Sequence, residues 1–195
     1  LSHVPVVSLD SPADANRDTV QFDLRDAMAA ATAHVLGSGR RRIGIISPYD
    51  PFDLFVKQRY QALYGAAHGA GARIAHFKLV DNSRRGALNL GLQIAALPAA
   101  ERPNALFCNN DHLAIGIYHG LRRAGLRVPD DVAIVGVDGI EEADLLDIPL
   151  STIKNPVDEL CRIAVTMLRE RIEEEETGPA RHVPVTSVFL SKGST

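Results

Sequence analysis

Cysteine is scarce in this 195-residue sequence. The two cysteines, Cys108 and Cys161, lie far apart, and each lies within an apolar segment. This arrangement fits neither a disulfide framework nor the closely spaced ligand pairs that hold zinc. The sequence therefore excludes a small disulfide-stabilised scaffold, and it favours a reducing, cytoplasmic compartment.

The sequence also has no surplus of basic residues and no long apolar run. Its formal net charge is −3 at pH 7, whereas nucleic-acid-binding domains usually carry a positive surplus. No apolar stretch approaches the length of about 20 residues that spans a bilayer. The chain starts at Leu1, with neither an initiator methionine nor a signal peptide, which indicates a piece of a longer protein. We therefore predict a folded chain that contacts neither membrane nor DNA by itself.

Signatures of catalysis and cofactor binding are missing as well. There is no G-x-S-x-G, Walker or H-E-x-x-H motif. The glycines around Gly65, Gly69 and Gly71 end a helical pattern, whereas a dinucleotide fingerprint opens a helix after a strand. None of the seven histidines has a cysteine or carboxylate at metal-ligand spacing on one helix face. We predict that the chain is not an enzyme and has no catalytic residue, no cofactor and no metal site.

Short apolar runs that alternate with helical patterns are the main feature of the sequence. Strands are expected at residues 5–9, 42–47, 73–79, 105–108 and 132–137, and helices at residues 24–36, 55–68, 84–97 and 112–124. An irregular acidic segment at 138–149 precedes a short strand at 151–153, a helix from residue 157 to about residue 174, and a last strand at 182–190. This alternation predicts an α/β fold with open parallel sheets flanked by helices.

Polar side chains follow several of the expected strands. They are Asp10 after the first strand, Tyr49, Asp50, Phe52 and Asp53 after the second, Asn109, Asn110 and Asp111 after residue 108, and Asp138 after residue 137. Ligands bind at the carboxyl ends of strands in open parallel sheets, and carboxylates, amides and aromatic rings suit a small polyhydroxylated ligand. The same residue types are ordinary helix caps and turn formers, so a purely structural role has about equal weight for each.

Several strings of the sequence resemble a known family in their order and spacing. They are PVVSLD at residues 5–10, HVL at 34–36, GRRRI at 39–43, NDHLAIG at 110–116, GLRVPDDVAIVGVD at 125–138 and PLSTI at 149–153. Together they resemble the effector-binding domain of LacI/GalR transcriptional regulators, over essentially the whole chain. The resemblance implies a periplasmic-binding-protein-like fold and a sensor for a sugar, sugar phosphate or nucleoside-like effector.

The resemblance also implies a division into lobes and a set of partners. The family's sensor has two similar lobes with the ligand between them. Residues 20–150 would form one complete lobe, and residues 1–19 and 151–195 would form part of the other. The implied partners are the effector, a second copy in a homodimer, and operator DNA, which the family contacts through a separate N-terminal head that is absent here.

The resemblance carries over six ligand-contact positions. They are Arg59, Asp138, Asn110 and Asn155, with Asp10 and Phe55 as weaker, member-specific contacts. The planar fork of Arg59 can donate two hydrogen bonds to neighbouring hydroxyls, and the carboxylate of Asp138 can accept from them. This chain departs from the family at Gly139, where a second acid is frequent, and at Val157, where sugar repressors can offer an aromatic ring.

Two other functions remain open from the sequence. A solute-binding protein of a sugar ABC transporter shares the two-lobed fold, although the strings at 125–138 and 149–153 favour the repressor. A small α/β enzyme that uses a cleft with Asp138 and Asn110 would lack a paired nucleophile and base, a metal set and a cofactor loop.

Overall fold

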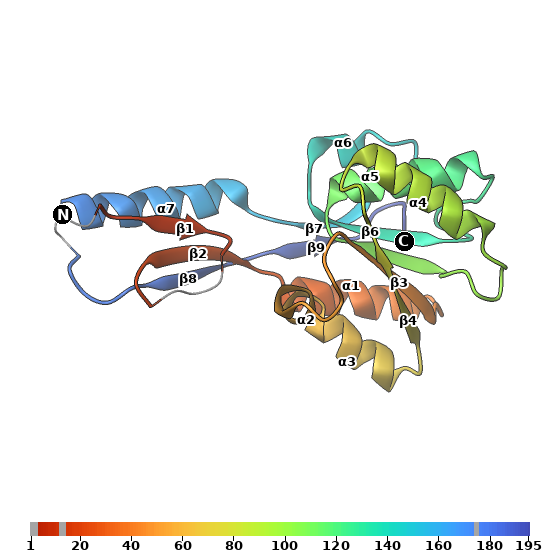
Figure 1. Cartoon of the computed structure of the whole chain (residues 1–195), viewed down its shortest axis with the longest axis horizontal. Helices are drawn as coiled ribbons and strands as arrows, with labels where there is room; N and C mark the ends of the chain where they lie inside the picture. The colour runs from red at the N-terminus through yellow and green to blue at the C-terminus, as the bar shows by residue number, and fades with distance from the viewer. Residues whose placement is uncertain (1–3, 12–14, 174–175) are drawn as a thin grey trace. The chain divides into compact units, whose positions relative to one another are not determined.

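The computed structural model (Figure 1) describes residues 4–11, 15–173 and 176–195, and it leaves the side chains of Leu54, Phe55 and Gln58 undescribed. The chain forms two compact units. The small unit takes in residues 1–24 and 155–187, and the large unit takes in residues 25–154 and 188–195.

The large unit is built on a six-stranded sheet. Its strands, in spatial order, are β4 (Arg73–Lys78), β3 (Arg42–Ser47), β5 (Ala105–Cys108), β6 (Ala133–Asp138), β7 (Ser151–Lys154) and β9 (Val188–Leu190). The first five strands run parallel, and β9 pairs antiparallel with β7. The carboxyl ends of β3, β5 and β6 therefore lie side by side at one edge of the sheet.

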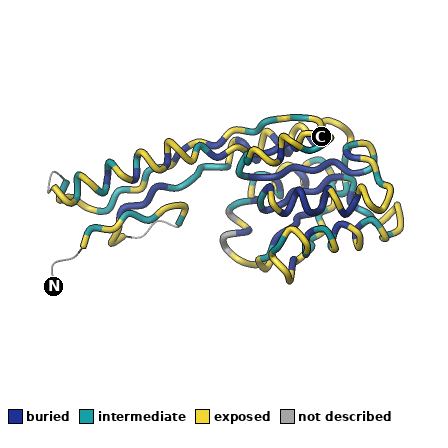
Figure 2. The backbone as a smooth tube through the Cα atoms, turned by 90° about the horizontal axis from the view of Figure 1, so that it is seen from above, coloured by how far each residue is buried: buried dark blue, intermediate teal, exposed yellow. Residues whose placement is uncertain are grey.

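Helices cover both faces of this sheet (Figure 1). One face carries α1 (Arg25–Gly37), α2 (Leu54–Arg59) and α3 (Gln61–Gly69). The other face carries α4 (Arg84–Ala96) and α5 (Asp111–Arg123), with the short α6 (Glu141–Asp144) beside them. Figure 2 shows buried residues concentrated in the strands of this unit, as expected for parallel strands covered on both faces.

Helix α5 shows how the sequence builds this core. Leu113, Ile117 and Leu121 recur every four residues, so they share one face of the helix, and all three are buried in the apolar core. The helix starts after Asn110, which caps it, and it ends before Gly125, which adopts a φ of +83° that favours glycine. Sequence spacing and end signals together therefore fix the helix that leads away from β5.

The small unit contains a three-stranded parallel sheet and one long helix. The strand order is β1 (Val7–Leu9), β2 (Asp18–Asp23) and β8 (His182–Thr186), and α7 (Val157–Ile172) packs against β1 and β2. Its core combines residues from α7 with residues from the strands: Val20, Leu160, Ala164, Met167 and Val185.

A buried ion-pair network closes the small unit. The Asp18 side chain is 1% exposed. Arg171 donates to it through Nη2 (2.8 Å) and Nε (3.0 Å), and Arg181 donates through Nη2 (3.0 Å) and its backbone N–H (2.8 Å). Hydrogen bonding from Arg171, and then from Arg181, holds the pKa of Asp18 far below its usual range, although burial opposes this shift. The carboxylate therefore ties α7 to the segment that precedes β8.

Most of the expected elements are confirmed, two differ, and two further elements were not expected. The expected strands at 42–47 and 105–108 coincide with β3 and β5, whereas β2 and the short α6, in the segment expected to be irregular, were not expected. The expected single helix at 55–68 is wrong, because Tyr60 has a ψ of 12° and separates α2 from α3. The expected strand at 182–190 is two strands, β8 and β9, which belong to different sheets.

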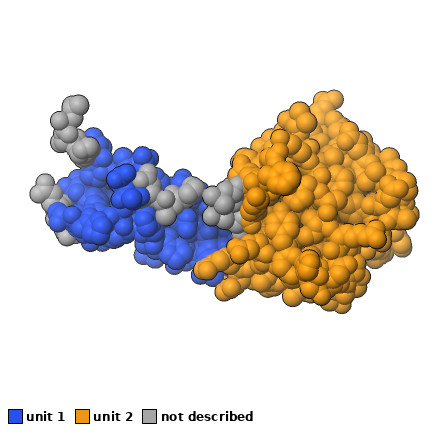
Figure 3. All heavy atoms as spheres, turned by 60° about the horizontal axis from the view of Figure 1, so that its bottom comes forward, with its two compact units in different colours: residues 1–24, 155–187 blue, residues 25–154, 188–195 orange. Residues whose placement is uncertain are grey.

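The observed units also divide the chain at residues other than those expected for the lobes (Figure 3). Residues 20–24 lie in the small unit because β2 pairs with β1 and β8. Residues 151–154 and 188–195 lie in the large unit because β7 pairs with β6 and β9 pairs with β7. None of the described helices is long and apolar enough to cross a bilayer.

Candidate functional site

Three of the predicted contact residues follow neighbouring strands of the large sheet. Arg59 ends α2, the helix after β3, Asn110 follows β5, and Asp138 ends β6. Because β5 pairs in parallel with both β3 and β6, all three residues come from the same edge of the sheet. The fold therefore places them at the edge where the sequence predicted a ligand site, and their contact with a ligand stays a prediction.

Arg59 links the loops that follow β3 and β5. Its Nη1 donates to the backbone oxygen of Asn109 at 2.9 Å and approaches the Asn109 Oδ1 at 3.4 Å. Asn109 is buried, and its backbone N–H donates to Ile46 in β3 at 2.9 Å. A guanidinium has five N–H donors in a planar arrangement, and the bond to Asn109 helps to orient the group.

Asn110 is the N-cap of α5. Its backbone is extended, and its Oδ1 accepts from the backbone N–H of Leu113 at 2.9 Å. The structural role that the sequence left open is therefore present. The cap uses the carbonyl oxygen of the side chain, and the amide nitrogen takes no part in it. A ligand contact through that nitrogen stays a prediction.

Asp138 stands in a tight turn at the end of β6. It is partly buried and has a φ of +113°, which is rare outside glycine. Gly139 follows with a φ of +76°, and a Cβ there would approach Lys154 Cγ to 2.7 Å. The absence of the family's frequent second acid thus has a local reason, since a side chain at residue 139 would be strained and would meet Lys154.

Asp111 anchors this turn from the start of α5. Its Oδ2 accepts from the backbone N–H groups of Gly139 (2.7 Å) and Ile140 (3.0 Å), and its Oδ1 accepts from Thr152 Oγ1 (2.7 Å) in β7. The residue is 0% exposed. Burial raises the pKa of Asp111, whereas the hydrogen bonds from Thr152 and from the two backbone groups lower it.

Two exposed aromatic side chains lie in the loop after β3. Tyr49 donates its backbone N–H to Ser47 Oγ at 3.1 Å, and Phe52 donates its own to Asp50 Oδ1 at 2.9 Å. The Lys57 ammonium lies 5.7 Å from the centroid of the Phe52 ring. These rings are the aromatic surface that the sequence placed near the strand ends, and they can cover an apolar sugar face.

The remaining predicted contacts are divided between the units. Asp10 follows β1 with a φ of +46°, is exposed, and accepts from the Phe22 N–H at 3.4 Å. Asn155 is buried, and its Oδ1 accepts from Ser187 Oγ at 2.7 Å. Both belong to the small unit. Phe55 lies in α2, but its side chain is outside the described part of the structure. The ligand role of these residues stays a prediction.

Sequence reasoning named Asn109 and Asp111 as polar residues after a strand but did not select them. The available signal was the run Asn109, Asn110, Asp111 directly after a buried strand. It could not show that Asn109 accepts a hydrogen bond from Arg59, or that Asp111 accepts one from Gly139 after β6. Arg59 and Gly139 lie far from these residues in the sequence. Among the described residues, no group of three or more His, Cys, Asp or Glu could hold a metal ion.

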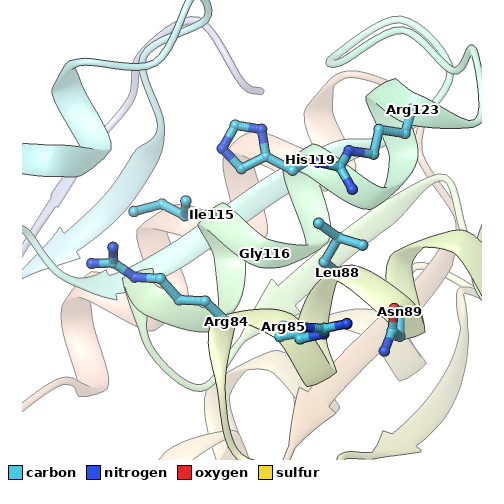
Figure 4. A pocket seen from close by; sticks show the side chains of 8 residues that line it. All are labelled: Arg84, Arg85, Leu88, Asn89, Ile115, Gly116, His119 and Arg123. Atoms are coloured by element: carbon cyan, nitrogen blue, oxygen red, sulfur yellow. The ribbon is translucent and has the colours of Figure 1, made fainter.

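A separate groove runs between α4 and α5 (Figure 4). Its volume is about 440 Å³, its floor includes Leu88, Ile115 and Gly116, and its rim is basic, with Arg84, Arg85, His119 and Arg123. Arg84 also donates to His112 Nδ1 through Nε at 3.1 Å and lies 3.5 Å from Glu142. A second hollow, of about 380 Å³, lies beside it and is lined by Tyr118, His119, Arg122, Arg123, Leu145, Leu146 and Asp147.

The large unit is an open α/β fold with polar residues at the carboxyl ends of its parallel strands. Comparisons with known proteins agree, because the family description "periplasmic binding protein-like domain" matches residues 32–195. The chain belongs to this family, and its resemblance to LacI/GalR regulators is confirmed.

The relatives are repressors. The ribose operon repressor of Escherichia coli (strain K12) is 32% identical over 195 residues, which cover 98% of this chain and 58% of that protein. The HTH-type transcriptional repressor PurR of Photobacterium profundum is 29% identical over 177 residues, which cover 89% of this chain and 52% of that protein. The chain thus spans about half the length of the curated relatives that it matches.

Solved structures share the fold. A LacI family transcriptional regulator from Enterococcus faecium with bound ribose has a TM-score of 0.86 at 24% identity, over 98% of this chain and 70% of that chain. A LacI family regulator from Lactobacillus casei with bound glucose has a TM-score of 0.84 at 23% identity, over 97% of this chain and 69% of that chain.

Proposed function

We propose that this chain is the ligand-sensing and dimerisation part of a cytoplasmic transcriptional repressor, and that it binds a small sugar or a related polar metabolite. The observation that carries the proposal is the convergence of Arg59, Asn110 and Asp138 at one edge of the large sheet. A guanidinium donor and a carboxylate acceptor at one edge of a sheet suit the neighbouring hydroxyls of a sugar.

Ligand binding would act by a population shift. A ligand that binds one conformation of the sensor better than another changes the affinity for operator DNA by a coupling free energy of about 1 to 3 kcal/mol. The chain itself, with a net charge of −3, is not proposed to contact the DNA.

A repressor is favoured over a transporter's solute-binding protein and over an enzyme. The relatives named above are repressors, and one of them is named for the ribose operon. Structural neighbours titled as LacI family regulators hold ribose or glucose. These names support a sugar as the effector of this chain, with ribose as the first compound to test.

Calorimetric titration with ribose, other pentoses, hexoses, their phosphates and nucleosides tests the proposal. We expect one compound to bind with one site per chain, and we expect that compound to change operator binding by the full-length protein. The proposal would be contradicted if none of the compounds bound, or if none of them changed the affinity for operator DNA.

The proposed homodimer uses the face formed by α4, α5 and the acidic segment around α6. The groove contributes Arg85 and Arg123, and the segment contributes exposed Glu141 and Asp147 together with Leu145, whose surface is 75% exposed. A two-fold interface brings the same patch of each copy together. The basic part of the patch on one copy can then face the acidic part of the patch on the other.

Charge reversal tests this interface. We expect Arg123→Glu to raise the dimer dissociation constant at least tenfold, because like charges would then oppose each other, and we expect Arg123→Glu combined with Glu141→Arg to restore most of the affinity. Sedimentation velocity over a concentration series measures the effect. Arg73→Glu, at an exposed arginine in β4, is the matched control. A wild-type monomer, or an Arg123→Glu variant that dimerises normally, would refute this face.

A further inference from the structure

We propose that Asp111 is the positioning residue of the strand-edge site: its buried carboxylate holds the turn after β6 and so determines where Asp138 meets a ligand. The inference rests on the proposed function, because it assigns a role to a residue that acts through the ligand-binding carboxylate.

The burial of Asp111 requires an explanation beyond packing. A fully buried carboxylate is unfavourable unless hydrogen bonds compensate it, and an apolar side chain of similar volume would fill the same space. Asp111 stands in the first turn of α5, where the helix dipole favours a negative charge. Its oxygens accept from Thr152, Gly139 and Ile140. The carboxylate is thus kept in place by several groups at once.

The groups that Asp111 binds are those that determine the position of Asp138. Gly139 and Ile140 directly follow Asp138, and both donate their backbone N–H groups to one carboxylate oxygen. Asp138 keeps its rare φ of +113° next to this anchor. A residue in a sparsely populated conformation persists when its surroundings constrain it, and here the constraint is the pair of hydrogen bonds to Asp111.

Strand β6 leaves room for this carboxylate. A Cβ at Gly136, two residues before Asp138, would collide with Asp111 Oδ1 and would come within 3.1 Å of its Cγ. The backbone of β6 therefore approaches Asp111 as closely as only glycine permits.

Asp111 is thus linked to two of the three polar residues at the strand edge. It directly follows Asn110 at the start of α5, and it accepts from the backbone N–H of Gly139, the residue after Asp138. Affinity depends on how well binding groups are held in place before the ligand arrives. Loss of the anchor should therefore weaken binding although Asp111 itself is fully buried.

The test compares amide exchange and ribose affinity. In Asp111→Ala, which removes the acceptor of both N–H groups, we expect hydrogen exchange at Gly139 and Ile140 to accelerate at least tenfold relative to the amides of β6, and ribose affinity to fall at least tenfold. Thr152→Val removes a single donor and should shift both readouts in the same direction by less, whereas Thr152→Ser should keep both near wild type. Leu121→Ala, in the buried face of α5 away from the turn, destabilises the unit and should leave ribose affinity within twofold.

The outcomes separate this inference from the proposed function. Wild-type affinity and exchange in Asp111→Ala would overturn it, and so would an equal affinity loss in Leu121→Ala. If the wild-type protein binds no sugar, the proposed function fails, and exchange at Gly139 and Ile140 alone then decides whether Asp111 holds the turn. If Asp111→Ala does not fold, Thr152→Val against Thr152→Ser decides in the same way.

Discussion

Replacement of Arg59 by alanine is expected to weaken ribose binding by at least about tenfold and up to more than a hundredfold. Charge-assisted hydrogen bonds contribute about 1.5 to 3 kcal/mol each, and 1.4 kcal/mol corresponds to a factor of ten in affinity. Arg59 is already held at the strand edge by its bond to Asn109, so little ordering of its side chain opposes ligand binding. Calorimetric titration of the variant with ribose measures the loss.

Two further variants separate the effect of the planar donor pair of Arg59 from the effect of its positive charge. Arg59→Lys keeps the positive charge but loses the planar pair of donors, so it should recover only a small part of the affinity. Arg73→Ala removes an exposed cation from β4, away from this edge, and should leave affinity within about twofold, since exposed charges contribute little. Wild-type binding by Arg59→Ala would place the ligand away from this edge.

Removal of the Asp18 carboxylate is expected to be the most destabilising single change in the small unit. Asp18→Ala should lower the free energy of unfolding by about 3 to 5 kcal/mol, the usual cost of breaking a buried ion pair by removing one partner. Arg171 and Arg181 would lose their shared acceptor and would remain largely buried, with side chains 16% and 29% exposed. Urea denaturation, together with amide exchange in β2 and β8, measures the change in the small unit.

The same network predicts a pH dependence. The folded-state pKa of Asp18 lies below its unfolded value of about 3.9. Its contribution to stability is therefore complete above about pH 4 and is lost as the pH falls below that value. Asp18→Asn should flatten the acid side of the stability profile, whereas Glu159→Gln, at an exposed carboxylate on α7, should change stability by less than about 1 kcal/mol. An unchanged acid limb in Asp18→Asn would contradict this account.

The fold could be predicted to a large extent because its signals are local. Apolar runs such as residues 42–47 and 105–108 coincide with β3 and β5, and the spacing of Leu113, Ile117 and Leu121 marks the buried face of α5. Local signals failed where the pairing of strands far apart in the chain decides which sheet a segment joins. The run at 182–190 is one apolar pattern, but its two halves hydrogen-bond with different strands.

The candidate site could be predicted as a set of residue types but not as an arrangement. Strand order explains why Arg59, Asn110 and Asp138 share an edge, and the resemblance to LacI/GalR regulators selected these positions. Neither could indicate that Asn110 also caps α5 or that Arg59 bonds to Asn109, because such contacts depend on side-chain geometry.

The sequence by itself determined the alternation of strands and helices, the residue types at the strand ends and the membership of a periplasmic-binding-protein-like family, since these depend on local pattern and on literal strings. Tertiary structure alone decided how the chain divides into two units, how Asp18 binds Arg171 and Arg181, and how Asp111 reaches across to the turn after Asp138. The physical reason is that these features join groups far apart in the chain, and only the folded packing brings a buried charge within hydrogen-bonding distance of its partners.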